Sequence, residues 1–284
     1  MENLNSHLTA KEREKLSYPS RILLNQNLIT GKVLDFGCGH GKDVEELKEK
    51  GIDINGYDPY YQPDYPTKKY DTILCHYVLN VIQRQEQAKA LYEISTLLKF
   101  GGKAYISVRR DVKKPGFRTH FIHKVKTYQT NVVLPFKSVF KNDNLEIYEF
   151  QHYCFLNQNN QKVSPFFEKL EPKEQVGELA SCLAFLDKFP VSRGHTLVIP
   201  KRKVSNYFEL SFKEQSACWF LVNLIKNDLQ KEFNPNGFNI GININEDAGQ
   251  TIPHAHIHII PRYSGDVENP SGGVRGVIPE KKEY

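Results

Sequence analysis

Apolar residues in the first half of the chain come in short runs that alternate with segments of helical spacing. Short apolar runs are typical of buried strands, and apolar residues three to four positions apart are typical of helices. We expect strands at Lys32–Phe36, Ile52–Tyr57, Thr72–Tyr77 and Lys103–Val108, and helices at Thr9–Asn25, Asp43–Lys50 and Gln83–Leu98. This alternation predicts an α/β fold, with a parallel sheet and helices on its faces.

The pattern becomes less regular after Arg109. Thr130–Phe140 and Leu145–Phe155 are expected to form an antiparallel pair that closes the sheet. The polar run Asn157–Val163 is typical of a linker. We therefore predict two domains, residues 1–162 and residues 163–284.

The second half has a different pattern, with strands around one long helix. We expect strands at Leu183–Leu186, Thr196–Ile199, Phe238–Ile244 and His254–Ile260, and an amphipathic helix at Lys213–Phe233. Strands with a single long helix indicate an α+β domain. The helix is expected to serve as core and as the interface of a homodimer.

Composition agrees with two soluble domains in 284 residues. No run approaches 18 apolar residues, so we expect no membrane span. The polar segment Met1–Arg13 has no signal-peptide core, which favours a cytoplasmic protein. The five cysteines lie singly, and this indicates neither a disulfide framework nor a cysteine zinc site.

Three histidines alternate with apolar residues in the run His254-Ala255-His256-Ile257-His258. In a strand, this spacing places the three imidazoles on one face and the apolar residues on the other. Neutral imidazole is a nucleophile, a general base and a metal ligand at pH 7. A metal site is therefore the rival interpretation on local pattern alone.

The segments around this run contain groups suited to phosphate. Gly249-Gln250-Thr251 precedes it, with Asn243 on the strand before, and these are neutral hydrogen-bond donors. Further upstream lie Phe185-Leu186-Asp187 and Gly194-His195-Thr196.

Together these motifs resemble the histidine triad (HIT) family of nucleotidyl hydrolases and transferases over about Val163–Tyr284. The resemblance implies that His256 attacks the α-phosphorus of a nucleotide, forming a nucleotidyl-histidine that water then hydrolyses. His254 and His258 would orient it and stabilise charge, and His195 would complete the set. The implied substrate residues are Asn243, Gly249, Gln250 and Thr251 at the phosphates and leaving group, Asp187 at the ribose, and Phe185 and Leu186 at the base.

One motif departs from many bacterial members of that family. They begin with Cys-Pro-x-Cys, which helps to hold zinc, whereas this chain has Ser164-Pro165-Phe166-Phe167. Without the thiolates we expect no structural zinc and no metal in this domain.

The run Asp35-Phe36-Gly37-Cys38-Gly39-His40-Gly41 follows an expected strand. Glycines let the backbone approach a ligand closely, and Asp58 ends the next strand at a distance that suits a ribose. The spacing differs from the dinucleotide motif GxGxxG.

This loop resembles class I S-adenosylmethionine-dependent methyltransferases, with a Rossmann-like sheet, and more narrowly methyltransferase-like proteins associated with DNA phosphorothioation. The narrower resemblance rests on Gly56-Tyr57-Asp58-Pro59-Tyr60 and on Tyr77–Ile82. It implies that Asp35, Gly37, Gly39 and Gly41 line the methionine end of S-adenosylmethionine and that Asp58 binds its ribose.

Two departures bear on catalysis by this first domain. The segment after Asp58 is short and proline-rich, so the usual extra helix and strand do not fit. Cys75-His76-Tyr77 stands where amino-group methyltransferases often have Asn/Asp-Pro-Pro-Tyr. His76 is either a base or an ordinary partly buried histidine.

Charge divides unevenly between the halves. Residues 1–165 carry 24 Lys and Arg against 18 Asp and Glu, and residues 166–284 carry 14 against 15. Seven cations in the segment 109–126 are interleaved with Phe117, Phe121 and histidines, a pattern that suits single-stranded nucleic acid. A solvated loop is the alternative.

The sequence thus predicts a bifunctional protein: a HIT-type nucleotide hydrolase fused to an S-adenosylmethionine-dependent methyltransferase. In the alternative, the first domain is a non-catalytic adaptor that binds the cofactor or a nucleic acid.

Overall fold

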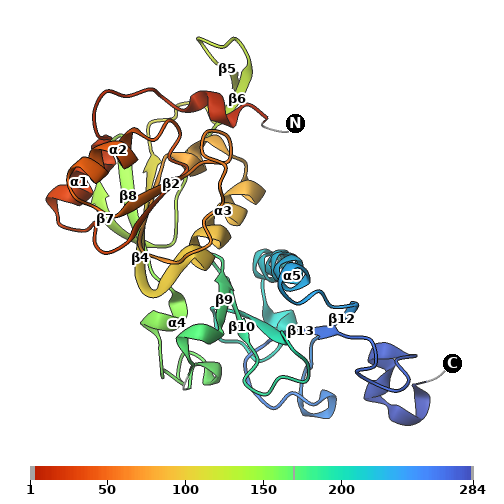
Figure 1. The fold of residues 1–284 in the computed structure, drawn as a ribbon. Coiled ribbons are helices and arrows are strands. Elements are labelled where there is room, and N and C mark those ends of the chain that lie inside the picture. The colour runs from red at the N-terminus through yellow and green to blue at the C-terminus, as the bar shows by residue number, and fades with distance from the viewer. Residues whose placement is uncertain (1–3, 169, 283–284) are drawn as a thin grey trace. The chain divides into compact units, whose positions relative to one another are not determined.

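The computed structural model describes residues 4–168 and 170–282. The chain divides into two units after His152, and Figure 1 shows each unit built around its own sheet. The first is an α/β unit and the second an α+β unit, as the sequence predicts. Residues 1–3 and 283–284, with which the predicted domains begin and end, lie outside the residues that the structure describes.

The first unit contains a six-stranded mixed sheet in the order β2-β1-β3-β4-β8-β7. The pairs β1–β2, β1–β3 and β3–β4 are parallel, and β8 pairs antiparallel with β4 and β7. The strands are β1 (Val33–Phe36), β2 (Ile54–Tyr57), β3 (Tyr70–His76), β4 (Leu98–Arg109), β7 (Lys137–Lys141) and β8 (Leu145–Phe150), and the helices are α1 (Tyr18–Asn25), α2 (Lys42–Glu49) and α3 (Arg84–Leu97).

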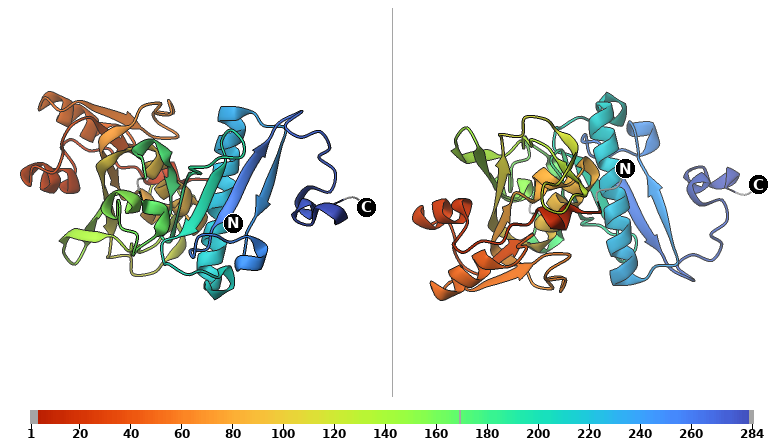
Figure 2. Two further views of the ribbon diagram at one scale, coloured as in Figure 1. Left: turned by 90° about the horizontal axis from the view of Figure 1, so that it is seen from below. Right: turned by 90° about the horizontal axis from the view of Figure 1, so that it is seen from above.

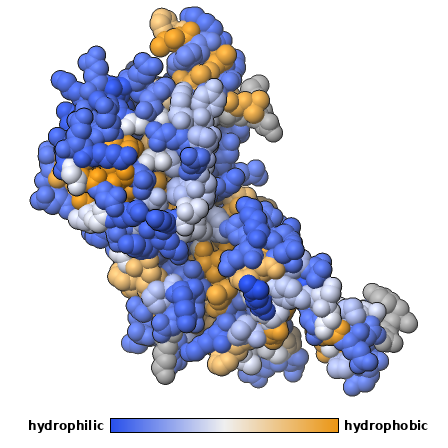
Figure 3. Space-filling view, in the orientation of Figure 1, coloured by the Kyte–Doolittle hydropathy of each residue, from blue (hydrophilic) through white to orange (hydrophobic). Residues whose placement is uncertain are grey.

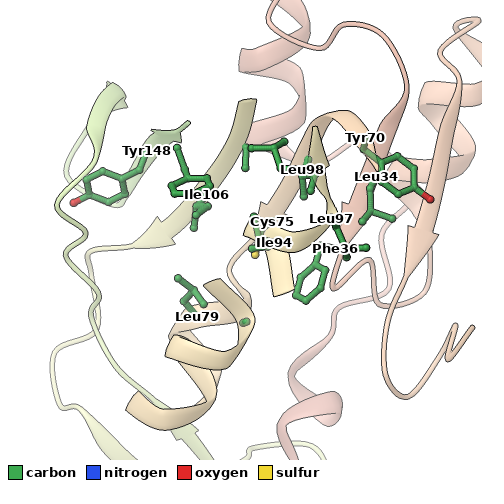
Figure 4. Packing of buried hydrophobic residues seen from close by; sticks show 14 of the residues in the cluster. Leu34, Phe36, Tyr70, Cys75, Leu79, Ile94, Leu97, Leu98, Ile106 and Tyr148 are labelled. Atoms are coloured by element: carbon green, nitrogen blue, oxygen red, sulfur yellow. The ribbon is translucent and has the colours of Figure 1, made fainter. Parts of the chain in front are cut away.

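Burial on both faces explains the apolar runs of this sheet. Every residue of β1 is buried, and so are all residues of β3 except Asp71. One core packs α3 against the sheet, and Figure 4 shows Leu79, Ile94 and Leu97 facing strand residues such as Leu34 and Ile106. A second core lies around Leu23, Leu47 and Tyr105.

Strand β1 is the point where the chain changes direction across the sheet. β1 lies between β2 and β3, so the chain segments that follow these strands run to opposite sides of β1. In open α/β sheets, ligands bind in the crevice at such a switch point. The glycine-rich loop 37–41 lies there, and Gly37, Gly39 and Gly41 all have positive φ.

Two predicted boundaries in this unit are wrong. The helix expected at Thr9–Asn25 begins only at Tyr18, because Pro19 tolerates only the first turn of a helix and the Ser17 side chain caps it. The strand expected to run to Phe155 ends at Phe150, and residues Tyr153–Leu156 form the short helix α4.

The segment expected as one strand, Thr130–Phe140, is also shorter in the structure. It contributes only β7, from Lys137. Before it, β5 (Gly116–Thr119) and β6 (Lys126–Gln129) pair as a separate two-stranded ribbon, which projects at the top of Figure 1.

The second unit contains a five-stranded antiparallel sheet in the order β12-β13-β11-β10-β9. Its strands are β9 (Gln175–Glu178), β10 (Cys182–Leu186), β11 (Thr196–Pro200), β12 (Gly237–Gly241) and β13 (Ile257–Arg262). Helix α5 (Phe212–Phe233) buries Cys218, Leu221 and Ile225, and Figure 2 shows it running along this sheet.

Two predicted strands of this unit have different bounds in the structure, where β13 continues to Arg262. Phe238–Ile244 ends at Gly241, and His254–Ile260 begins only at Ile257. Ahead of β13, the N–H groups of His254 and Ala255 donate to the carbonyls of Ile252 and Val204, outside the sheet ladder. His254 and His256 therefore both precede the strand, and only His258 lies on it.

Within the described residues, no helix combines the length and the apolar character that crossing a bilayer requires.

The carboxylate of Asp43 links α1 to α2, and we predict that this link stabilises the first unit. It accepts hydrogen bonds from Ser17 N (2.8 Å), Ser17 Oγ (2.5 Å) and Ser20 Oγ (2.7 Å). Asp43→Ala leaves these donors without their partner and should lower the free energy of unfolding by about 1–3 kcal/mol in urea titrations.

The exposed Glu49→Ala at the end of the same helix is the control. Burial opposes ionisation of Asp43, but His76 and the serine donors hold its pKa below the ordinary value. Its contribution should therefore be present at neutral pH and decline as pH falls through that lowered pKa. A difference between the two variants that does not change with pH would contradict this assignment.

Candidate functional site

The imidazoles of His256 and His258 lie together at the start of β13. Their ring centroids are 4.9 Å apart. The residues of β13 alternate, with Ile257 and Ile259 buried in the core and His258 partly exposed. His258 lies on β13 and His256 directly precedes it, so these two predicted site residues are neighbours, while His254 is held separately.

His254 has both ring nitrogens engaged. Its Nε2 lies 2.9 Å from the carbonyl oxygen of Pro200, which can only accept, so Nε2 carries the hydrogen. Ser164 Oγ then donates to Nδ1 at 2.8 Å. Burial lowers the pKa of His254 to about 4, and the ring is neutral at pH 7. Charge stabilisation by this ring therefore stays a prediction.

The backbone of His254 sets the tautomer of His256. Nδ1 of His256 donates to the carbonyl of His254 at 2.8 Å, which leaves the lone pair on Nε2. Burial lowers the pKa of His256, so the ring is neutral at pH 7. A neutral imidazole with an unoccupied lone pair is a nucleophile.

A chain of hydrogen bonds sets the tautomers of His195 and His258. Val191 N–H donates to Nδ1 of His195 at 3.3 Å, so its Nε2 carries the hydrogen and donates to Nδ1 of His258 at 3.0 Å. Nε2 of His258 is then an N–H donor. It is buried without a hydrogen-bond partner in the described part of the chain.

Asp187 lies at the far end of this chain. One of its oxygens is 3.4 Å from Nδ1 of His195. Burial lowers the pKa of His195, and the negative charge of Asp187 opposes that effect. The negative charge of Asp187 thus favours the protonated form of His195, a contact that the sequence analysis did not consider.

The residues predicted for the phosphates lie on the loop between β12 and β13. The amide of Gln250 holds this loop, because it accepts from Asn245 N and donates to the carbonyls of Ser205 and Ile252. Thr251 is exposed and Asn243 partly exposed. Gly249 has φ of 82°, a left-handed conformation that favours glycine.

Phe166 is a site residue that the sequence analysis did not identify. Its ring centroid lies 5.1 Å from His256 and 5.5 Å from Phe185. Phe185 is buried and Leu186 partly buried. The sequence signal for Phe166 was the departure from Cys-Pro-x-Cys, because Ser164 and Phe166 occupy the first and third positions of that motif.

Asp187, His195 and His258 form a group that could hold a metal ion. Each offers one ligand atom, and these atoms lie within 4.8 Å of one another. The two imidazoles of this group, His195 and His258, share a hydrogen bond. Ser164 stands where many bacterial relatives have the first cysteine of the zinc motif, and here its side chain hydrogen-bonds to His254.

The second candidate site is the cleft at the glycine loop of the first unit. Asp35 is buried there, and none of the described residues hydrogen-bonds its carboxyl group. Burial and the charge of Asp43 raise the pKa of Asp35 to about 8. The lining residues are Lys11, Arg13, Asp35, Gly37, Cys38, His40, Gly41, Lys42, Asp43 and His76.

Asp58 directly follows β2, and its side chain binds the glycine loop. Its carboxylate accepts from the backbone N–H groups of Gly39 (3.1 Å), Tyr60 (2.9 Å) and Tyr61 (3.0 Å). A carboxylate has about four acceptor positions, so one remains for a ligand. The proline-rich segment 59–69 forms no helix or strand.

His76 is buried at the end of β3 with both nitrogens engaged. Nε2 lies 2.9 Å from Ser20 Oγ, and Nδ1 lies 2.9 Å from Ser107 Oγ. Burial lowers the pKa of His76 to about 4. Of the two roles considered for His76, this geometry favours the buried structural histidine.

Comparisons with known proteins match both units. The model of the HIT domain matches residues 168–265, and that of a methyltransferase domain matches residues 6–168. Protein hit of Bacillus subtilis is 42% identical over 32% of this chain and 63% of its own length. The bis(5'-nucleosyl)-tetraphosphatase of Schizosaccharomyces pombe is 41% identical over 29% of this chain and 46% of its own length.

A solved structure of a HIT family protein from Bacillus anthracis is 43% identical. The match covers 35% of this chain and 69% of that protein, with a TM-score of 0.33. The chain thus spans less than two thirds of the length of the two curated relatives named above.

We predict that the second unit needs no structural zinc, because Ser164 and Phe167 offer no thiolate. Dialysed protein should carry no stoichiometric zinc in elemental analysis, and a chelator should leave its melting temperature unchanged. One zinc per chain, with stability lost on chelation, would contradict this. Asp187→Asn, compared with Ser164→Ala, would then show whether the trio of Asp187, His195 and His258 holds the ion.

Proposed function

This chain belongs to the HIT domain family and to the methyltransferase domain family, and we propose that its second unit hydrolyses or transfers nucleotides through His256. The observation that carries this proposal is the pair of unoccupied nitrogens at the start of β13. His256 offers a lone pair at Nε2, and His258 offers an N–H at Nε2.

In the first step, Nε2 of His256 attacks the α-phosphorus and the bond from phosphorus to the leaving oxygen breaks. The Nε2–H of His258 donates to a phosphate oxygen, where negative charge increases in the transition state. A water molecule then attacks the phosphorus of the nucleotidyl-histidine, and Nε2 of His256 leaves. The buried ring needs no deprotonation beforehand, because its pKa lies below the ordinary value.

His195 and Asp187 support this reaction through His258. The hydrogen bond from His195 keeps Nδ1 of His258 as an acceptor, and the carboxylate of Asp187 favours a proton on His195. The remaining implied contacts stay proposals: Asp187 with the ribose, Phe185 and Leu186 with the base, and Asn243, Gly249, Gln250 and Thr251 with the phosphates. The tetraphosphatase relative favours a dinucleoside polyphosphate as the substrate class.

For the first unit we propose binding of S-adenosylmethionine at the glycine loop. The buried carboxyl group of Asp35 has no partner, and the cofactor carries an ammonium group and a sulfonium that would satisfy it. Gly37, Gly39 and Gly41 let the backbone approach the ligand, and Asp58 has one acceptor position left for the ribose. When bound, the cofactor supplies the methyl group.

A non-catalytic first unit is the second candidate function. The observation that favours it is His76, which has no nitrogen left to take a proton from a methyl acceptor. In this case the first unit would be an adaptor that binds the cofactor or a nucleic acid, and only the second unit would be catalytic.

Three further statements from the sequence stay proposals. The boundary at residues 162 and 163 falls between the end of the first compact unit and the start of the HIT match. A homodimer through α5 and a cytoplasmic location also stay predictions.

We predict that His256→Ala lowers hydrolysis of diadenosine tetraphosphate on the order of a thousandfold or more, because it removes the nucleophile. Nucleotide release, followed by chromatography, measures this. The exposed His123→Ala is the control and should keep full activity. His254→Ala should have a smaller effect. Turnover by His256→Ala close to that of the unchanged protein, with an unaltered circular dichroism spectrum, would assign the nucleophile elsewhere.

We also predict that S-adenosylmethionine binds more tightly as pH rises from about 6 to 8. The pKa of Asp35 is about 8 in the free protein, so the group is mostly protonated at pH 6 and must lose its proton to pair with a cation. Each pH unit below that pKa should cost up to about tenfold in affinity.

Calorimetry in buffers of different ionisation enthalpy should detect the released proton. Asp35→Asn should weaken binding and abolish the pH dependence over this range. Asp53→Asn, on the loop ahead of β2, is the control. Binding by the unchanged protein with no proton release would contradict the role of Asp35, and no binding at any pH would favour the adaptor.

A further inference from the structure

The β5–β6 ribbon and the chain leading into it, residues 109–129, carry a large uncompensated positive charge; we name this segment the basic hairpin. No Asp or Glu occurs between Asp111 and Asp143. Arg109 and Arg110 are paired with Asp111 and Glu146. The exposed side chains of Lys113, Lys114, Lys124 and Lys126, by contrast, form no ion pair with any residue that the structure describes.

The tip of the basic hairpin exposes an aromatic and an aliphatic side chain. Phe121 is 85% exposed and Ile122 is 72% exposed. The ammonium of Lys124 lies 4.6 Å from the centre of the Phe121 ring. In Figure 3, hydrophobic surface appears among hydrophilic surface at the top of the molecule, where Figure 1 places this ribbon. Aromatic rings beside cations are the elements that bind single strands, through base stacking and phosphate pairing.

The base of the hairpin is anchored next to the glycine-loop cleft. The side-chain amide of Asn80 donates to the carbonyl of Thr130 (2.7 Å), and Thr130 N donates to the carbonyl of Asn80. Asn80 belongs to the short 3-10 helix Val78–Val81, and a side chain on Gly37 would collide with Val78. The hairpin therefore rises from the edge of the sheet where β1 and β3 end.

We propose that the basic hairpin binds single-stranded nucleic acid, with lysines at the phosphates and Phe121 stacked on a base. Binding itself does not depend on the cofactor. That the bound strand supplies the methyl acceptor rests on the proposed function of the first unit. A membrane surface is the less favoured partner, because interfacial segments bury a broad apolar face, whereas this tip exposes two apolar side chains.

The test measures fluorescence anisotropy of a labelled oligothymidylate of about 20 nucleotides with the full chain and no cofactor. Replacing Lys113, Lys114 and Lys124 by Gln should weaken binding about tenfold or more. It should also reduce the slope of log affinity against log salt by about 2, since each phosphate contact on a single strand contributes about 0.7. Replacing Lys173, Lys213 and Lys231 by Gln in the second unit is the matched control and should change affinity less than about twofold.

A second pair of variants separates stacking from charge. Phe121→Ala should weaken binding about tenfold with an unchanged salt slope, because stacking on one aromatic ring contributes about 1–3 kcal/mol per base. Phe212, which is 83% exposed on α5, provides the control Phe212→Ala.

Three outcomes would overturn the proposal. They are no binding by the unchanged protein at low salt, equal affinity of the hairpin and control variants, and binding to duplex at least as tight as to the single strand. Sedimentation with phosphatidylserine vesicles, without oligonucleotide binding, would assign the hairpin to a membrane instead. Cofactor binding measured on the same samples reports separately on the proposed function, because these variants leave the cleft residues unchanged.

Discussion

The chemistry that we propose for the second unit depends on neutral imidazoles whose tautomers are set by their hydrogen bonds. Backbone groups determine those tautomers: the carbonyl of Pro200 acts on His254, the carbonyl of His254 on His256, and Val191 N–H on His195. A carbonyl can only accept and an N–H can only donate, so these contacts favour one tautomer of each ring. These contacts leave the lone pair on Nε2 of His256 next to the N–H at Nε2 of His258.

The first unit arranges its buried polar groups in another way. Asp43 receives donors from Ser17 and Ser20, and the network continues through His76 to Ser107, so α1, α2, β3 and β4 are joined. Asp35 lies near this network, where burial and the charge of Asp43 raise its pKa and the charge of Arg13 opposes them. A buried carboxyl group without a partner costs free energy, which a cationic ligand would recover.

The glycine-loop cleft and the basic hairpin belong to one edge of the first sheet. The chain leaves β4 at Arg109 to enter the hairpin and returns through Thr130, which bonds to Asn80 after β3. Parallel strands place their carboxyl ends together, so a cofactor site and a polymer-binding surface can share that edge. The nucleotide site that we propose for the second unit belongs to a separate, antiparallel sheet.

The sequence by itself determined the glycine loop, the histidine run and the main strands and helices of both sheets, because each has a local period or spacing. It also predicted that His256 and His258 lie together, and their ring centroids are 4.9 Å apart, although β13 itself begins only at Ile257. It did not predict the β5–β6 ribbon, β9 or α4. Only the tertiary structure decided that His254 lies off the strand and bonds to Ser164, 90 positions away, and that His76 bonds to Ser20 and Ser107. Contacts between distant segments leave no period in the sequence, and whether a polar group is free or engaged depends on the partner that folding brings to it.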